Sequence, residues 1–323
     1  MDEKQKKKLL WQLPFLTILV IGSILIIRQQ QTIPFQHDNG LAFGTVYSVI
    51  YQCDKNLKEE IEVELQKVDD EFSMFNETST VARINRGEKV EESPMYREVY
   101  KLAQTVNRET DGAFDITVAP LVNAWGFGFK NEQMPTRHQV DSLLRIRNQY
   151  DFSAIAKGYG SEVVARLLRR HDIKNFMVEI GGEVVTQGIS EKRLPWKIGV
   201  TKPTDDSLSV SSELQTVLNV TNISMATSGN YRNFYYKDGK KYAHTIDPKT
   251  GYPVQHSLLS ATVLAKSCAV ADAYATSFMV MGMERAKILL ERHPELMAYF
   301  IYANPDGTNG VWFSPSLQDK IAE

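Results

Sequence analysis

Apolar positions recur along this chain with two different periods, one typical of helices and one of strands. The apolar side chains of Leu65, Val68 and Phe72 are three or four positions apart, as on one face of a helix. The same period, with helix stop signals such as Asp111-Gly112, recurs in several segments. Helices are predicted over residues 57–75, 95–108, 138–148, 161–170, 267–281 and 284–292.

Short runs of β-branched and aromatic residues predict strands between these helices. The first run, over residues 43–51, reads Phe-Gly-Thr-Val-Tyr-Ser-Val-Ile-Tyr. Further strands are predicted over residues 175–180, 196–200, 214–220, 223–227, 232–236, 260–264 and 297–302. Strands and helices do not alternate regularly, as they would around a parallel sheet. The predicted fold class is therefore α+β, with large mixed or antiparallel sheets flanked by helices.

The N-terminal segment follows neither period. Leu9 to Ile27 is a run of 19 residues without a charged side chain. At about 1.5 Å per residue this run is long enough to cross a bilayer, so one transmembrane helix is expected before the α+β domain. A cleaved signal peptide is the alternative, but its apolar core is normally shorter and ends in an Ala-x-Ala-like site. Arg28 and three glutamines follow here instead.

Charge around this run predicts how the chain is oriented. Four lysines lie within residues 1–8, which predicts a cytoplasmic basic tail before an anchor at 9–27. Residues 28–40 are expected to be a linker, and 41–323 an exported catalytic domain. The expected location is the inner (cell) membrane, single-pass, with the catalytic domain on the periplasmic or extracytoplasmic side.

Composition is that of a folded protein with an acidic body. The chain has 323 residues, 43% of them apolar and 24% charged, which is enough for one large domain or two ordinary ones. Residues 1–30 hold five of the 37 basic and two of the 39 acidic side chains, so the remainder has a net charge of −5. This balance argues against nucleic acid as a partner.

Cysteine usage excludes one kind of site and leaves another question open. Cys53 and Cys268 either form one disulfide or are both buried thiols. Packing is the favoured role for Cys268, because alanines surround it. Two cysteines and scattered histidines lack the ligand spacing of a zinc site.

Oxygen ligands for a hard cation are the main chemical signal. Asp272 and Thr276 are four residues apart, hence on one face of a predicted helix rich in alanine. A mid-helix Asp is commonly a solvated residue, but this helix is apolar enough to be buried, and a buried carboxylate needs a cation or hydrogen bonds. Carboxylate and hydroxyl oxygens suit Mg²⁺, which shares its other positions with water and substrate phosphates.

Two further segments carry candidate groups that are weak signals when taken alone. His244 and Asp247 flank a Pro/Gly turn, where a structural histidine and an ordinary Asp-Pro turn are the alternatives. Lys157-Gly158-Tyr-Gly160 precedes a predicted helix N-terminus, a ready anion site, but matches neither the dinucleotide fingerprint nor a P-loop. An aromatic loop at 125–129 either presents rings to a ligand or packs them into the core.

Seven segments in one order resemble the FAD:protein FMN transferase (ApbE) family. They span roughly residues 40–305. The segments are Thr110-Asp-Gly-Ala-Phe-Asp115-Ile-Thr-Val, Pro120-Leu-Val-Asn-Ala-Trp125-Gly-Phe-Gly128, Asp151-Phe-Ser-Ala-Ile-Ala-Lys157-Gly158-Tyr, Glu179-Ile-Gly-Gly182, Thr227-Ser-Gly-Asn-Tyr231, His244-Thr-Ile-Asp-Pro-Lys-Thr-Gly251 and Ala271-Asp-Ala-Tyr-Ala-Thr276. A visible departure is Glu183, which follows the double glycine where relatives commonly carry Asp or Asn.

The resemblance implies a Mg²⁺-dependent enzyme that uses FAD as substrate. FMN would pass to a Thr or Ser hydroxyl of an acceptor flavoprotein, and AMP would leave. The acceptor would be a membrane redox or ion-pumping complex subunit. The cation would be held by the backbone carbonyl of Ala154 and the side chains of Asp272 and Thr276. Flavin and adenine contacts would fall on Phe43, Phe75, Ala113, Phe114, Asp115, Asp151 and Lys157, with His244, Ile246 and Asp247 near the phosphates.

Elementary chemistry agrees with this implication and assigns roles within it. Phosphoryl transfer depends on positioning and charge neutralisation, which a sparse oxygen site around Mg²⁺ supplies. An acceptor hydroxyl needs a base, and His244 is the best-matched titrating group. Asp247 would orient His244 or bind ribose. Two alternatives use the same residues: an FAD pyrophosphatase that releases FMN and AMP, and a membrane-tethered flavin-binding protein without catalysis.

Overall fold

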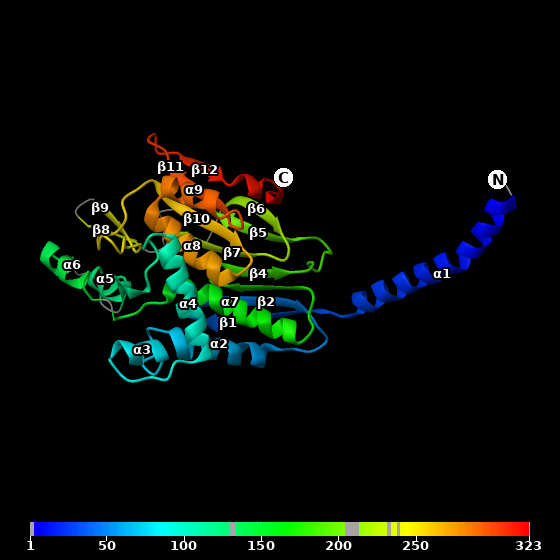
Figure 1. Cartoon of the computed structure of the whole chain (residues 1–323), viewed down its shortest axis with the longest axis horizontal. Coiled ribbons are helices and arrows are strands. Elements are labelled where there is room, and N and C mark those ends of the chain that lie inside the picture. Colours follow the sequence, from blue (N-terminus) through cyan, green and yellow to red (C-terminus); the bar gives the residue numbers. More distant parts are fainter. Residues whose placement is uncertain are drawn as a thin grey trace.

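The computed structural model describes residues 3–128, 134–146, 148–203, 213–230, 234–237 and 240–322. An antiparallel sheet of eight strands runs through this part of the chain, in the order β1-β2-β3-β4-β7-β10-β11-β12 (Figure 1). Its strands are β1 (Phe35–Ala42), β2 (Thr45–Gln52), β3 (Phe176–Ile180), β4 (Glu183–Gln187), β7 (Ser224–Gly229), β10 (Leu258–Ala265), β11 (Met297–Ala303) and β12 (Asn309–Phe313). The predicted α+β class with antiparallel sheets is confirmed.

Helices cover one face of the sheet, and a hairpin covers the other. On the helical face α7 (Ser153–Arg170) packs on β3 and β4, and α8 (Cys268–Met281) packs on β7 and β10 (Figure 1). Around these two lie α2 (Lys58–Phe72), α4 (Pro94–Glu109) and α9 (Met283–Arg292). On the other face, β5 (Trp196–Thr201) and β6 (Leu214–Val220) form a two-stranded hairpin that buries Trp196 and Leu218 against the sheet.

Hydrophobic spacing explains the central elements. The predicted face of α2 is buried, with Val68 and Phe72 in the main core. In β2, Tyr47, Val49 and Tyr51 alternate inward, as expected for a strand with one buried face. Almost every residue of α8 is buried, which confirms the expectation that Asp272 lies on a buried helix.

The predicted glycine turn before the helix at 161–170 is wrong. α7 begins at Ser153, so Lys157, Gly158 and Gly160 are helical. A Cβ at Gly158 would lie 2.5 Å from the carbonyl oxygen of Cys268, so this glycine allows α7 and α8 to pack closely. Close helix packing, and not a turn, explains the glycine.

Short and edge elements escaped the sequence patterns. They include α3 (Thr80–Asn85), α5 (Ala119–Ala124), a 3₁₀ turn at Ile116–Val118, another at Pro315–Lys320, β4, β12, and β9 (Lys240–Ala243), which pairs with β8 (Phe234–Lys237) in a small hairpin. The predicted helix at 138–148 is α6 (Arg137–Leu143), and residue 147 lies outside the described part. The predicted strand at 232–236 begins outside it as well and corresponds to β8.

The sequence predicts a linker over residues 28–40, and this prediction is wrong for residues 35–40. Its second half belongs to β1, which pairs with β2 over its whole length. β1 reads as polar because it is an edge strand, and its buried Asp38 accepts a hydrogen bond from the Tyr51 hydroxyl at 2.7 Å. The folded domain therefore begins before residue 41.

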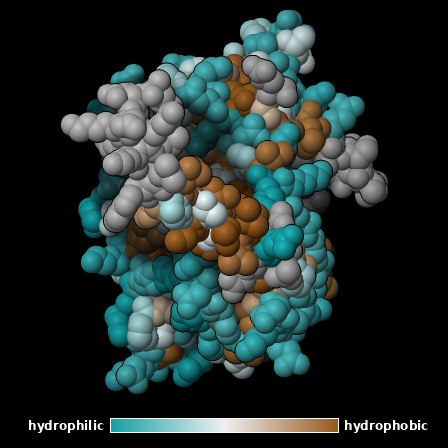
Figure 2. Space-filling view, turned by 90° about the vertical axis from the view of Figure 1, so that its right-hand side faces the viewer, coloured by the Kyte–Doolittle hydropathy of each residue, from teal (hydrophilic) through white to brown (hydrophobic). Residues whose placement is uncertain are grey.

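The prediction of a transmembrane helix at residues 9–27 is also wrong. Residues 9–27 are helical, within α1 (Glu3–Thr32), but no helix in the described part of the chain is long and apolar enough to cross a membrane. Gln12, Thr17 and Ser23 are polar positions within this uncharged run. Large apolar side chains between Leu13 and Ile27 are 45–70% exposed, and the face viewed from the side of α1 shows a central hydrophobic area (Figure 2). The expected extracytoplasmic location stays a prediction.

The two cysteines are free thiols, so the disulfide alternative is wrong. Cys268 is buried, and its Sγ donates to the carbonyl oxygen of Val184 at 3.5 Å. Packing between α8 and β4 is its role, as its alanine-rich surroundings predicted.

Candidate active site

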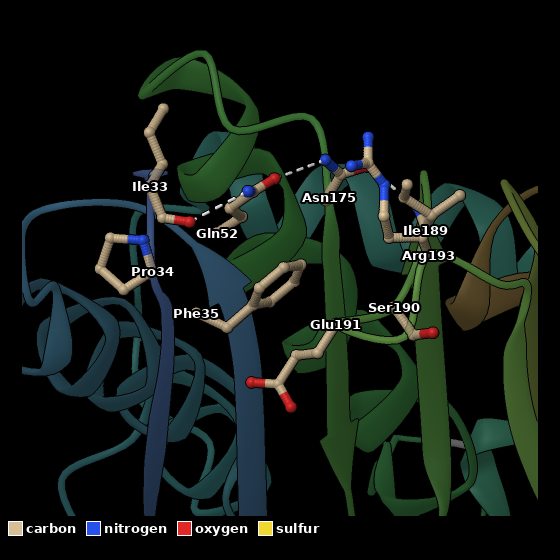
Figure 3. A pocket seen from close by; sticks show the side chains of 9 residues that line it. All are labelled: Ile33, Pro34, Phe35, Gln52, Asn175, Ile189, Ser190, Glu191 and Arg193. Atoms are coloured by element: carbon tan, nitrogen blue, oxygen red, sulfur yellow. Dashed lines mark hydrogen bonds between the residues drawn. The ribbon is translucent and has the colours of Figure 1, made fainter. Parts of the chain in front are cut away.

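A cavity of about 430 Å³ opens where α7, α8 and β7 meet the loops on the helical side of the sheet. A neighbouring cavity of about 420 Å³ shares Met74, Phe75, Ser153 and Lys157 with it, so the two cavities adjoin. A third cavity, of about 370 Å³ beside Ile33, contains none of the predicted site residues (Figure 3).

Most of the predicted site residues line the first cavity. These are Phe75, Ala113, Phe114, Asp115, Asp151, Ala154, Lys157, His244, Ile246, Asp272 and Thr276. Phe43 lines the neighbouring cavity instead. Asp247 lines neither, although Ile246 and Pro248 on either side of it do. Residues from five separate sequence segments thus converge on one space, while their chemical roles stay predictions.

Asp272 is the carboxylate at the bottom of this space. It is 3% exposed, and its Oδ2 accepts the backbone N–H of Gly158 at 2.9 Å. In a regular helix that N–H points to the carbonyl oxygen of Ala154, so the Asp272 carboxylate and the Ala154 carbonyl are directed at one backbone donor. Thr276 follows one helical turn later, and its Oγ1 lies 3.0 Å from Oγ of Ser228 on β7.

The Lys157 ammonium forms an ion pair with Glu183, which the sequence patterns do not identify as a functional residue. Its Nζ lies 2.6 Å from Oε1 of Glu183, at the start of β4. The Glu183 side chain is 2% exposed, and its Oε2 is buried without a hydrogen-bond partner among the described residues. The only signal in the sequence was its departure from Asp or Asn after the double glycine.

The electrostatics of this cluster favour the binding of a positive charge. Burial raises the pKa of both Asp272 and Glu183, and for Glu183 the nearby Asp272 raises it further. Burial alone would lower the pKa of Lys157, but Glu183 and Asp272 outweigh it and the net pKa is raised. When both carboxyl groups are ionised, the two carboxylates and one ammonium have a formal charge of −1, so a divalent cation fits the ionised cluster.

The donor set for such a cation is sparse. In the described part of the chain, no group of three or more His, Cys, Asp and Glu side chains could hold a metal ion. Backbone and hydroxyl oxygens would have to complete the site, which matches the predicted Ala154 and Thr276. A cation that keeps waters and binds phosphate oxygens is suited to this arrangement.

His244 and the aromatic loop form the opposite wall. The ring of Phe127 lies 6.3 Å from that of His244, in an edge-to-face arrangement, and both residues line the cavity. Trp125 is buried, and its Nε1 donates to the carbonyl oxygen of Gly251 at 2.7 Å. Both interpretations of this loop are therefore partly right, since Trp125 is a core residue and Phe127 faces the cavity. Phe129 lies outside the described residues.

Three Asp side chains shape the turns around the cavity. Asp247 Oδ1 accepts the backbone N–H of Lys249 at 2.9 Å, a contact that closes the Pro/Gly turn. Asp115 Oδ1 accepts the backbone N–H of Thr117 at 2.8 Å, and Asp151 Oδ1 accepts that of Ser153 at 2.8 Å. The Asp115 contact caps the 3₁₀ turn at 116–118, and the Asp151 contact closes the turn that precedes helix α7. All three carboxylates therefore already accept a local backbone hydrogen bond.

Comparison with known proteins gives one consistent result. Residues 43–300 match the sequence model of the ApbE family. The chain is 36% identical over 320 aligned residues to the FAD:protein FMN transferase of Vibrio cholerae, covering 90% of this chain and 94% of that protein. It is 33% identical to that of Escherichia coli strain K12, covering 82% of each. The solved flavin transferase ApbE from Vibrio cholerae superposes with a TM-score of 0.80 at 33% identity, covering 89% of this chain and 99% of that one.

Proposed function

The chain belongs to the ApbE family, and we propose that it uses Mg²⁺ at the Asp272 end of the cavity to transfer FMN from FAD to an acceptor protein. That it is an FAD:protein FMN transferase follows from the family and from curated relatives that carry this name. The observation that carries the proposal is the convergence of Asp272, Thr276 and Lys157 on the space that His244 faces. The acceptor is a Thr or Ser hydroxyl of a flavoprotein, with membrane redox or ion-pumping subunits as the proposed class.

Charge explains how the residues would divide the work. The pyrophosphate of FAD is an anion, and Lys157 presents an ammonium to the cavity. Mg²⁺, when bound, would neutralise phosphate charge in a site with formal charge −1. Asp272, Thr276 and the Ala154 carbonyl would hold it. Phe114, Phe75 and Phe127 supply apolar surface for the rings of the dinucleotide.

His244 is the proposed base on the other side of the phosphates. It would take the proton of the acceptor hydroxyl as that oxygen bonds to the phosphorus of the FMN half. The bond between this phosphorus and the bridging oxygen breaks, and AMP leaves with that oxygen. The acceptor then carries FMN through a phosphoester bond. If water replaced the acceptor, the products would be free FMN and AMP.

The purified full chain, FAD and a candidate acceptor flavoprotein provide the direct test. We expect AMP release and a covalent FMN adduct on the acceptor, detected by mass spectrometry, and we expect both to require Mg²⁺. Release of AMP and free FMN without an adduct would replace the transferase by the pyrophosphatase. Binding of FAD without AMP release would favour a flavin-binding protein.

His244→Ala should slow acceptor flavinylation by about 100- to 10,000-fold, the usual contribution of a general base. The initial rate of adduct formation at saturating FAD measures this effect. His138→Ala is the matched control, because His138 is exposed on α6 and lines neither cavity. Unchanged flavinylation by the His244 variant would exclude this residue as the base.

A further inference from the structure

Glu183 has a buried oxygen that no described residue satisfies. Its Oε1 is paired with Lys157 Nζ at 2.6 Å, whereas its Oε2 is buried and accepts no hydrogen bond from the described part of the chain. Burying a carboxylate with only one oxygen paired costs stability, and an apolar side chain of similar size would avoid the cost of the unpaired oxygen. A buried carboxylate can act through its charge on a neighbouring ionisable group.

That neighbour is Lys157, which is attracted by two carboxylates at once. Glu183 is buried and does not line the cavity, whereas Lys157 and Asp272 do. Asp272 attracts the same ammonium from α8. The helices are held close together at the next residue, where Gly158 N–H donates to Asp272 at 2.9 Å. The position of one ammonium therefore decides how much of the Asp272 charge is neutralised.

We infer that Glu183 is a positioning residue of the cation site: by holding the Lys157 ammonium, it keeps the negative charge of Asp272 available to a divalent cation. This inference rests on the proposed function, which places Mg²⁺ at Asp272. Without the charge of Glu183, Lys157 would pair with Asp272 and compete with the cation. The phosphate-facing ammonium would also move from the cavity wall.

A double variant tests whether Glu183 acts on the cation site through Lys157. The three side chains Asp272, Glu183 and Lys157 have a formal charge of −1 together. Glu183→Gln brings this charge to zero, and the double variant Lys157→Met with Glu183→Gln returns it to −1 on Asp272 alone. The double variant also removes the competing ammonium. If Glu183 acts through Lys157, the second substitution repairs the cation binding that the first one weakens.

Mg²⁺ binding to the full chain, measured by isothermal titration calorimetry without acceptor, is the readout. We expect Glu183→Gln to weaken binding about tenfold, in the range observed when a residue that orients a metal ligand is removed. We expect the double variant to bind within about threefold of the wild type, although it transfers FMN poorly because Lys157 is absent. Circular dichroism melting confirms that each variant is folded.

Glu98→Gln is the matched control, because Glu98 pairs with Arg166 at the same 2.6 Å distance but lies outside both cavities. Wild-type affinity in Glu183→Gln would overturn the inference. So would a double variant as weak as Glu183→Gln, since Glu183 would then act on the cation directly or only through folding. A wild type that forms the FMN adduct but binds no Mg²⁺ would overturn the cation part of the proposed function, and this inference with it.

Discussion

Helix α7 carries two ion pairs of equal length but different burial: an inner pair, Lys157–Glu183, and an outer pair, Arg166–Glu98. Near its start Lys157 lies 2.6 Å from Glu183, and near its end Arg166 lies 2.6 Å from Glu98. The first pair has side-chain exposures of 32% and 2%, and the second has 41% and 46%. Distance therefore does not distinguish them, and burial does. Solvent and salt screen the outer pair, whereas the inner pair contains a buried carboxylate and lies beside the buried Asp272.

For this reason the pKa values of Glu98 and Glu183 are shifted in opposite directions. Hydrogen bonds from the Arg166 guanidinium hold the pKa of Glu98 below its usual value. Burial, followed by the charge of Asp272, raises the pKa of Glu183 above its usual value in spite of Lys157. The outer pair stabilises the ionised form of Glu98, whereas burial of the inner pair favours the protonated form of Glu183 as long as no cation is bound. A site with an unsatisfied charge is prepared for a ligand of opposite charge.

Asp272→Ala should have the largest effect of any change near either pair. This substitution removes the buried carboxylate that would bind the cation. We expect Mg²⁺-dependent AMP release to fall by about 1,000-fold or more, because several kcal/mol of charge stabilisation would be lost. Chromatographic quantification of AMP from FAD, with and without Mg²⁺, measures it. Asp306→Ala, in the exposed turn between β11 and β12, is the control for loss of one carboxylate. Normal turnover of the Asp272 variant would remove this residue from the metal site.

Sequence patterns could identify Asp272 but not Glu183, and the reason is physical. The spacing of Asp272 and Thr276 on an alanine-rich helix is local, so the pattern reveals their shared face and burial. The partner of Lys157 lies 26 positions away on β4, a short strand that the patterns missed, and only the tertiary fold brings them together. Gly158 was misinterpreted for a similar reason, because its close neighbour belongs to α8.

The same distinction applies to the fold as a whole. The sequence predicts the amphipathic helix α2 because its helical period shows which face is buried. It predicts β10 because a short apolar and β-branched run is typical of a strand buried on both faces. The edge strand β1 was taken for a linker because most of its side chains are not fully buried, and burial is what the pattern detects. Asp38 in β1 is stabilised by Tyr51 on the neighbouring strand, and this contact has no local signal.

The pH dependence of stability should report the titration of the buried carboxyl groups of Asp272 and Glu183 directly. Folding raises the carboxyl pKa values of Asp272 and Glu183, so their contribution to stability is present below the ordinary carboxyl pKa and is lost as pH rises through the raised values. From about pH 5 upward we expect the metal-free protein to melt about 2–4 °C lower for each kcal/mol lost. Mg²⁺ should reverse this loss, and its stabilisation should be greater at pH 8 than at pH 5.

Melting curves by circular dichroism, with EDTA or with Mg²⁺ across this pH range, measure the effect. Glu183→Gln removes one of the two titrating groups, so its metal-free melting temperature should depend less on pH. Glu98 has the opposite sign, since its lowered pKa gives stability that is lost as pH falls. Equal Mg²⁺ stabilisation at pH 5 and pH 8 would contradict the assignment of the cation to the buried carboxylates.

Glu98→Gln should have the smallest effect, because the outer pair is screened and half exposed. Arg166 keeps one acceptor in the amide oxygen, and the Tyr159 hydroxyl, now 2.8 Å from Glu98 Oε2, keeps a partner within reach. We expect the free energy of unfolding, from urea denaturation, to fall by less than about 1 kcal/mol, as for exposed pairs generally. Mg²⁺ affinity and FMN transfer should stay within twofold of the wild type. A loss of stability or of cation binding as large as that of Glu183→Gln would show that the length of an ion pair, and not its burial, governs what each end of α7 contributes.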